Sequence, residues 1–160
     1  MTFIWIILFL GLAFGFFFAY PHKRSKAKFY EKILLSLSFF VIGGQGIVFG
    51  FIPHVFYAKI AAEKIGWATS PFQFEVGVQD GCWGLLAILS LWFKGGFLLA
   101  TCIGWSVFLL FAAYGHLKDT ILHHNYAPYN YGFIAGDLIP AIVILLFTFL
   151  YYKYGYKKYS

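Results

Sequence analysis

The stretch Phe97–His124, FLLATCIGWSVFLLFAAYGHLKDTILHH, decides how the rest of the chain is interpreted. It begins as a charge-free apolar run and continues, with no proline and no turn pair, into a polar end. Crossing the hydrocarbon layer takes about 20 apolar residues, and an uninterrupted run predicts one long helix. The sequence therefore predicts a membrane helix over 97–114 that extends to residue 124.

The polar end of this helix carries a stripe of residues suited to chemistry. At 100° per residue, one face collects Trp105, Leu109, Ala112, His116, Asp119, Thr120 and His123. His116 and His123 would lie two turns apart, with Asp119 between them. His124 is rotated off the stripe and is a weaker candidate. A functional site is expected here first.

Composition makes the bilayer the main partner of this chain. Of its 160 residues, 61% are hydrophobic and 11% are charged, whereas a soluble domain carries about 25% charged residues. The length fits a single domain over 1–160. The net charge of +6 is spread over segment ends and forms no patch, which argues against a nucleic-acid partner.

The apolar runs predict an all-α polytopic transmembrane bundle. Its five spans lie at about 2–20, 33–52, 76–93, 97–114 and 137–152. The first run is expected to stay attached, since no basic residue precedes it and no A-x-A-like cleavage site follows. After the second span, Lys59, Glu63 and Lys64 on an apolar background predict a short helix lying at the membrane interface.

The basic residues predict the orientation. The segment PHKRSKAKFYEK, residues 21–32, holds five Lys and Arg against one Glu, and such loops stay in the cytoplasm. The N-terminus is then outside, and the tail from Lys153, with Lys157 and Lys158, is inside. Of the 12 Lys and Arg, three fall outside (Lys59, Lys64 and Lys118), which leaves nine inside.

An acid and an amide lie within predicted spans. Asp80 shares a helix face with Gly77 and Gly84, which should pack against other helices and place the carboxyl inside the bundle. Such an acid is costly and marks either a functional site or a polar pair, for example with a Tyr, a Ser or Gln45. Gln45 itself needs a partner on another helix. Glu75 lies about 140° from Asp80 around the helix, so only an irregular helix lets both reach one ligand.

The predicted topology gathers titratable residues at the outer end. They are His54, Glu75, His116, Asp119, His123, His124 and Asp137, with Asp80 beneath them. Imidazole and carboxylate groups suit a divalent transition metal, and helix bundles build such sites from inward-facing side chains.

The metal interpretation has open alternatives. H-x-x-D-x-x-x-H is not an established metal signature, so interfacial hydrogen bonding, proton transfer and a bound organic ligand remain open. Asp137 also suits the N-cap of the last span, with Pro140 in its first turn.

Other chemistries are disfavoured. The chain has no CxxC, and Cys82 and Cys102 are expected at different depths, too far apart for a disulfide. No G-x-S-x-G and no phosphate-binding glycine loop occurs. Whether the protein is an enzyme stays open.

The region from about residue 70 to 140 resembles a family of small, uncharacterised bacterial integral membrane proteins. The shared features are SPFQFEVGVQDGCWGLLAIL, the pair Gly115-His116, and NYAPYNYG followed by Asp137. The resemblance implies a bacterial inner-membrane location and transfers no activity.

Three functions follow. The first is an outward-facing pocket for a divalent metal or small ligand, built on His116, Asp119 and His123 with Asp80 and Glu75 in support. Residues of a second rank are His54, His124, Asp137 and Gln45. The second function is a non-catalytic accessory subunit that docks a membrane partner. The third is a proton-coupled carrier, which at this length requires a homo-oligomer.

Overall fold

The computed structural model describes residues 2–155, and this part of the chain is helical almost throughout, without a β-strand. The elements in order are α1 (Thr2–Ala19), the 3-10 turn η1 (Tyr20–His22), α2 (Lys26–Leu37), the π-helix η2 (Ser38–Phe51), α3 (Ile52–Phe56), α4 (Ala58–Ile65), α5 (Phe72–Leu89), α6 (Gly96–His123) and α7 (Pro128–Tyr154). Since α2, η2 and α3 follow one another without a break, they form one rod. The predicted all-α class is confirmed.

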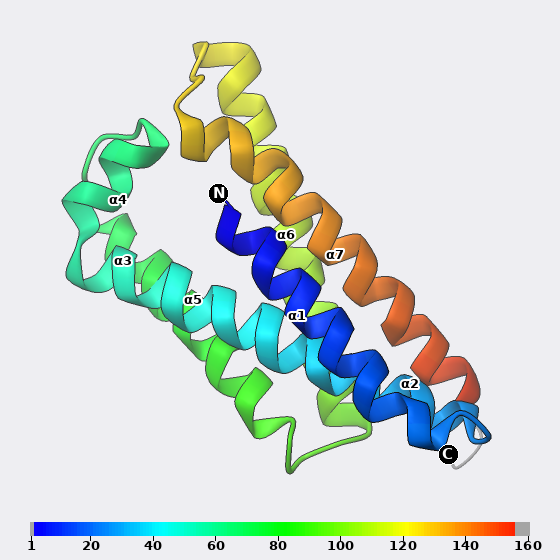
Figure 1. The fold of residues 1–160 in the computed structure, drawn as a ribbon. Helices are drawn as coiled ribbons and strands as arrows, with labels where there is room; N and C mark the ends of the chain where they lie inside the picture. Colours follow the sequence, from blue (N-terminus) through cyan, green and yellow to red (C-terminus); the bar gives the residue numbers. More distant parts are fainter. Residues whose placement is uncertain (1, 156–160) are drawn as a thin grey trace.

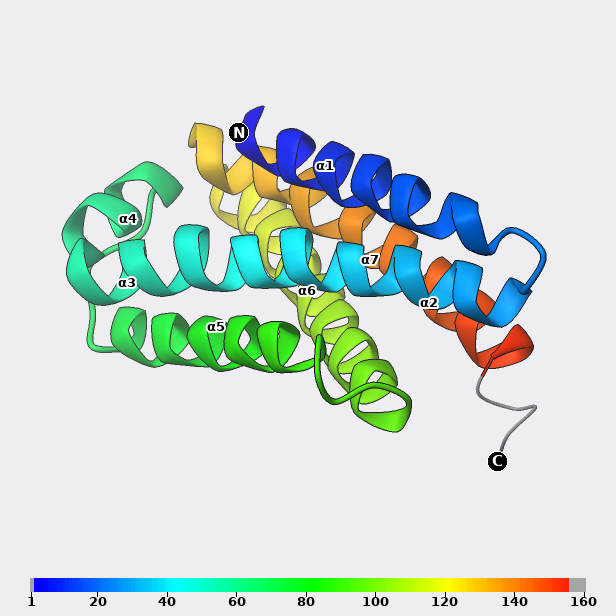
Figure 2. The same ribbon diagram turned by 60° about the horizontal axis from the view of Figure 1, so that its bottom comes forward.

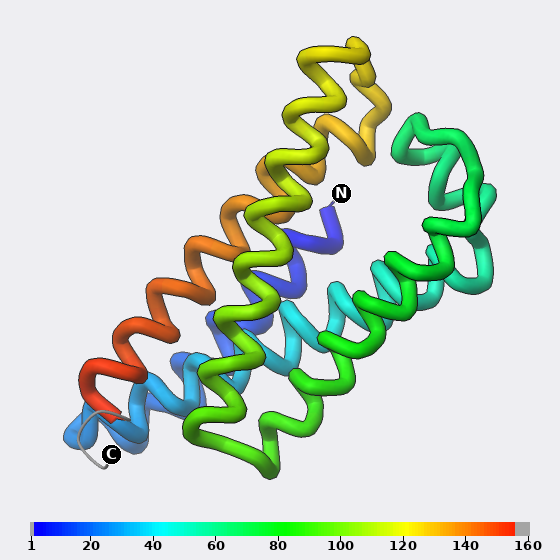
Figure 3. Tube along the Cα trace, turned by 180° about the vertical axis from the view of Figure 1, so that it is seen from behind, coloured from blue at the N-terminus to red at the C-terminus, as the bar shows by residue number. Residues whose placement is uncertain are grey.

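The helices form two arms that diverge from a common end (Figures 1 and 3). In one arm, α5 runs antiparallel along η2; in the other, α6 and α7 form an antiparallel pair. The arms meet where α2 packs against α7, and a turn at residues 90–95 joins α5 to α6. Figure 2 shows α1 lying over α2 and η2 on one side of the bundle.

Glycine allows the close contact between η2 and α5. A Cβ at Gly46 would lie 2.6 Å from the Asp80 carbonyl oxygen and 2.9 Å from the Gly84 nitrogen. A Cβ at Gly50 would collide with the Asp80 side chain. Small residues at such positions let helix backbones approach closely in membranes. The predicted glycine face of Asp80 is therefore confirmed, and it packs on η2.

Four helices in the described residues are long and apolar enough to cross a membrane. They are Thr2–His22, Lys26–Phe56, Gly96–His123 and Pro128–Tyr154. The predicted third span, 76–93, corresponds to α5, which begins and ends four residues earlier in the sequence. This helix is not among the four because Glu75, Asp80 and two glutamines lower its mean hydropathy. The five-span count and the N-out orientation therefore stay predictions.

The start of α7 corrects an interpretation. The segment NYAPYNYGFIAG, expected as a loop, turns helical at Pro128, which occupies the first turn where its missing N–H is not needed. Asp137 is consequently a buried residue inside α7, and its predicted N-cap role is wrong. The short helix predicted after the second span is present as α4.

Basic residues gather at the end where the arms meet, which we call the basic pole: residues 20–32, 90–95 and 151–155. Lys94 Nζ lies 3.9 Å from Glu31 Oε1, and Tyr151 Oη donates to Glu31 Oε2 at 3.4 Å, so the three segments touch. Lys26 Nζ lies 4.8 Å from the centre of the Tyr154 ring. Lys157 and Lys158 lie outside the described residues. The clustering agrees with the charge pattern used to predict orientation.

Candidate functional site

A cavity of about 420 Å³ lies between the two arms, away from the basic pole. Residues of η2, α3, α5, α6 and α7 line it, together with Ile65 and Trp67 from the α4 region. Most of the lining is aromatic or aliphatic. Its polar side chains include Gln45, His54, Asp80, His116 and Asp137. A largely apolar cavity of this size with a few convergent polar groups is typical of a small-molecule site.

Three polar side chains that line the cavity, those of Gln45, Asp137 and His116, lie next to one another. Gln45 Nε2 donates to Asp137 Oδ1 at 3.0 Å, and His116 Nε2 lies 4.0 Å from Asp137 Oδ2. The predicted need of Gln45 for a partner on another helix is thus met by α7. Gln45 Oε1, however, has no hydrogen-bond partner within residues 2–155.

The ring of His116 is fixed on both faces and at one nitrogen. It stacks on Trp67 with ring centres 5.5 Å apart and on Phe133 at 5.7 Å. Its Nδ1 lies 2.8 Å from Asn130 Oδ1. Since Asn130 Nδ2 donates to Thr120 Oγ1 at 2.9 Å, the Asn130 oxygen accepts and His116 Nδ1 carries the proton. His116 Nε2 is left directed at Asp137.

Asp80 reaches the cavity from α5 on the opposite arm. It is only 8% exposed, and its carboxyl packs against Gly50 of η2. No hydrogen bond or ion pair to this carboxyl occurs among the described residues. Trp105 Nε1, in the lining and 1% exposed, likewise has no partner there.

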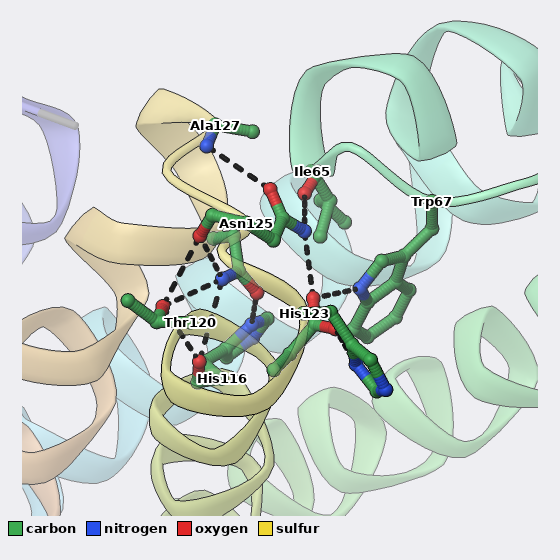
Figure 4. Close-up of polar contacts among 9 residues, drawn as sticks. Ile65, Trp67, His116, Thr120, His123, Asn125 and Ala127 are labelled. Atoms are coloured by element: carbon green, nitrogen blue, oxygen red, sulfur yellow. Dashed lines mark hydrogen bonds and ion pairs between the residues drawn. The ribbon is translucent and has the colours of Figure 1, made fainter.

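Asp119 and His123 lie outside the cavity, although they share a helix face with His116. Asp119 Oδ2 accepts from Trp67 Nε1 at 3.0 Å and from Asn125 Nδ2 at 2.6 Å, and Asp119 Oδ1 lies 2.8 Å from His123 Nδ1. Asn125 Nδ2 also donates to the carbonyl of Ile65 at 2.9 Å. We call Ile65, Trp67, Asp119 and Asn125 the clasp; Figure 4 labels Ile65, Trp67 and Asn125 of this set. The clasp ties the α4 region to the α6–α7 turn.

The remaining candidates fall in separate places. Glu75 is exposed on α5 and does not line the cavity. His54 is half-buried, lines the cavity and hydrogen-bonds Gln73. His124 is exposed and ends α6 in a left-handed conformation with φ of 53°. Of the candidates ranked first, the structure brings His116 and Asp80 to one cavity, with Gln45, His54 and Asp137 from the second rank.

The predicted metal site finds no support in the geometry. No group of three or more His, Cys, Asp and Glu within residues 2–155 is placed to hold a metal ion. The physical reason is that the clasp holds Asp119 and His123 beside Trp67, while the His116 ring is directed at α7. Cys82 and Cys102 are both free, as expected, and Cys82 is exposed whereas Cys102 is buried.

Comparison with known families finds one family model that matches almost the whole chain. The model of a family described as "Family of unknown function (DUF6790)" matches residues 1–157. The chain belongs to this family. Searches of curated proteins and of solved structures return no match. The DUF6790 match covers both arms and so includes every residue of the cavity, whereas the resemblance seen in the sequence covered only about residues 70–140.

Sequence reasoning missed three residues that hold the His116 ring in this DUF6790 protein. Asn130, which orients His116, and Phe133, which stacks on it, lie between the predicted fourth and fifth spans, and Trp67, which stacks on the other side, lies beyond the short helix predicted after the second span. The available signal was Pro128, a favourable first-turn residue that starts a helix and places Asn130 one turn from the chain reversal.

Proposed function

We propose that this DUF6790 protein is an integral membrane protein that binds a small amphiphilic molecule in the cavity between its arms. The observation that carries the proposal is the convergence of Gln45, Asp80, His116 and Asp137, from four helical segments, on one largely aromatic cavity. An accessory subunit without a ligand has no need for polar groups gathered around a space. Their convergence favours the pocket over that alternative.

The rim of the cavity supports an amphiphilic ligand. Phe72 on α5 and Phe111 on α6 both line the cavity, and they are 57% and 72% exposed. In a bilayer, such exposed aromatic side chains face acyl chains or the interface. A molecule with an apolar body can therefore approach between the arms and present its polar end to the buried groups.

The cavity is closed towards the basic pole, which bears on the carrier alternative. Below it, residues such as Ile42, Leu98, Cys102 and Ile144 form a continuous buried apolar core. A carrier needs a route through this layer, so it needs a second conformation. We retain binding from one side as the proposed function, with the cavity on the outer side and the membrane that of a bacterial cell.

A cavity-filling substitution tests the proposal. Ala112 lines the cavity on α6, whereas Ala100 is exposed on the same helix outside it. Protein in lipid nanodiscs is titrated with three probes of similar size: phenethylammonium, phenethyl alcohol and hydrocinnamate. Binding is followed by isothermal titration calorimetry, with empty nanodiscs correcting for partition.

We expect saturable binding of at least one probe, its loss in Ala112→Trp and its retention in Ala100→Trp. Absence of saturable binding of all three probes, or equal binding by the two variants, would contradict the proposed function.

Orientation is tested by labelling with a membrane-impermeant maleimide on intact cells. In a Cys82→Ser background, Thr69→Cys near the clasp is expected to react, and Ser25→Cys at the basic pole is expected to react only after lysis. The reverse pattern would place the cavity on the cytoplasmic side.

A further inference from the structure

We infer that the ligand of the cavity is an organic cation, an ammonium group carried on an apolar or aromatic body. This inference rests on the proposed function and names the ligand class of the same site. It starts from Asp80, a carboxyl that is 8% exposed, lines the cavity, and has no hydrogen bond or ion pair among the described residues. A buried carboxylate is costly unless it is paired.

The cavity has no permanently positive side chain of its own. The titratable groups among the described residues that line it are two aspartates and two histidines, with no lysine or arginine. Asp137 already accepts the Gln45 amide and faces His116, so one of the two carboxyls has protein partners and the other does not. A positively charged ligand supplies the ion-pair partner that Asp80 lacks, whereas an anionic ligand would add a third acidic group to a site that already holds two.

The walls suit a cation that also has an apolar body. Phe49, Trp105 and Phe108 line the cavity, and Trp67 and Phe133 stack on the His116 ring. Aromatic faces attract ammonium groups, and the attraction strengthens where water is excluded. Aromatic walls around a carboxylate are the arrangement by which proteins hold quaternary and primary amines.

Two polar atoms of the lining without a hydrogen-bond partner within residues 2–155 can bind the ligand in addition to Asp80. Gln45 Oε1 is a buried acceptor without a partner within residues 2–155, and it lies in the lining beside Asp137. A primary ammonium carries three N–H donors, so this oxygen is an acceptor for it in addition to the Asp80 carboxyl. Trp105 Nε1, the orphaned donor, is available to an acceptor on the ligand body.

The three probes distinguish this inference from the proposed function. Phenethylammonium and phenethyl alcohol differ in charge but hardly in shape, and hydrocinnamate reverses the charge. We expect the ammonium to bind about tenfold tighter than the alcohol, since a charged hydrogen bond is worth more than a neutral one. We expect the carboxylate to bind more weakly than the alcohol.

Variants assign the difference to one side chain. Asp80→Asn keeps the shape and removes the charge, so ammonium affinity should fall about tenfold and alcohol affinity should change less than about twofold. Glu75→Gln removes an exposed acid from the same helix and should change neither. If Asp80→Asn does not fold, the ranking of the three probes on the native protein still decides.

Equal affinity for the ammonium and the alcohol, or unchanged ammonium affinity in folded Asp80→Asn, overturns the cation inference and leaves the cavity as a site for neutral molecules. Absence of saturable binding of all three probes to the native protein overturns the proposed function as well.

Discussion

The basic pole and the cavity end differ in whether their charged side chains are exposed or buried. At the basic pole the cations stand at the surface, and the one acid, Glu31, meets Lys94 across 3.9 Å in a half-exposed position. At the cavity end the acids Asp80 and Asp137 are buried, and the partners of Asp137 are an amide and an imidazole. Exposed charge contributes to orientation in the membrane, whereas a buried acid is costly unless it has a partner. The predictions below compare the two ends.

The largest effect is expected where the backbones of η2 and α5 pack closely within one arm. In Gly46→Ala the new Cβ meets the Asp80 carbonyl at 2.6 Å and the Gly84 nitrogen at 2.9 Å, and neither backbone can yield. We expect the free energy of unfolding to fall by about 3 kcal/mol, measured by denaturant titration in micelles.

The matched control is Gly115→Ala on α6, where no heavy atom lies within 4 Å of the added Cβ. It should be neutral or stabilising by about 0.5 kcal/mol. Equal effects of the two substitutions would show that α5 does not rest on η2 as described.

The next effect concerns the buried pair of the cavity. Asp137→Leu leaves the Gln45 amide without its acceptor, and an orphaned buried polar group costs about 2 kcal/mol. Asp137→Asn keeps an acceptor oxygen and should lose much less stability. Thermal unfolding in micelles measures both, and equal loss in the two variants would mean that charge rather than the hydrogen bond matters at residue 137.

A smaller effect is expected for the clasp. Asn125→Ala removes the donations to Asp119 and to the Ile65 carbonyl, which should reduce stability by about 1 kcal/mol and speed amide hydrogen exchange in α4. His123→Ala removes a contact of a side chain that is 71% exposed, and should leave exchange in α4 unchanged. If both variants open α4 alike, the clasp does not hold it.

The smallest effect is expected at the basic pole. Glu31→Gln breaks the contact with Lys94, whose side chain is 43% exposed, and such pairs contribute less than about 0.5 kcal/mol. The same denaturant titration checks this value. A loss matching that of Asp137→Leu would erase the contrast between the two ends.

Much of the helical plan was predictable, because long apolar runs can satisfy their backbone groups in a membrane only as helices. The long helix predicted over 97–124 is α6, and four residues of its predicted stripe, Trp105, Leu109, Ala112 and His116, do line the cavity. Helix periodicity identified the face correctly at this level of the bundle.

The same periodicity failed further along the stripe. Periodicity predicts which residues share a helix face, but it does not predict where the neighbouring helices end. Asp119 lies beyond the cavity, where α6 contacts the α4 region through Trp67. The partner of Gln45 was equally hidden, because η2 is wound as a π-helix and turns by less than 100° per residue. Sequence spacing alone therefore did not show that Gln45 meets Asp137.

The hydrogen bond between Gln45 and Asp137 joins residues 92 positions apart, which has a consequence for how the protein is made. During translation, Gln45 leaves the ribosome long before α7 does, and until then its amide lacks the acceptor that the finished protein supplies. Unpaired amides in hydrocarbon seek other helices. A chain truncated before residue 137 therefore lacks the acceptor of the Gln45 amide, and arrival of the last helix both completes the cavity and pairs this amide.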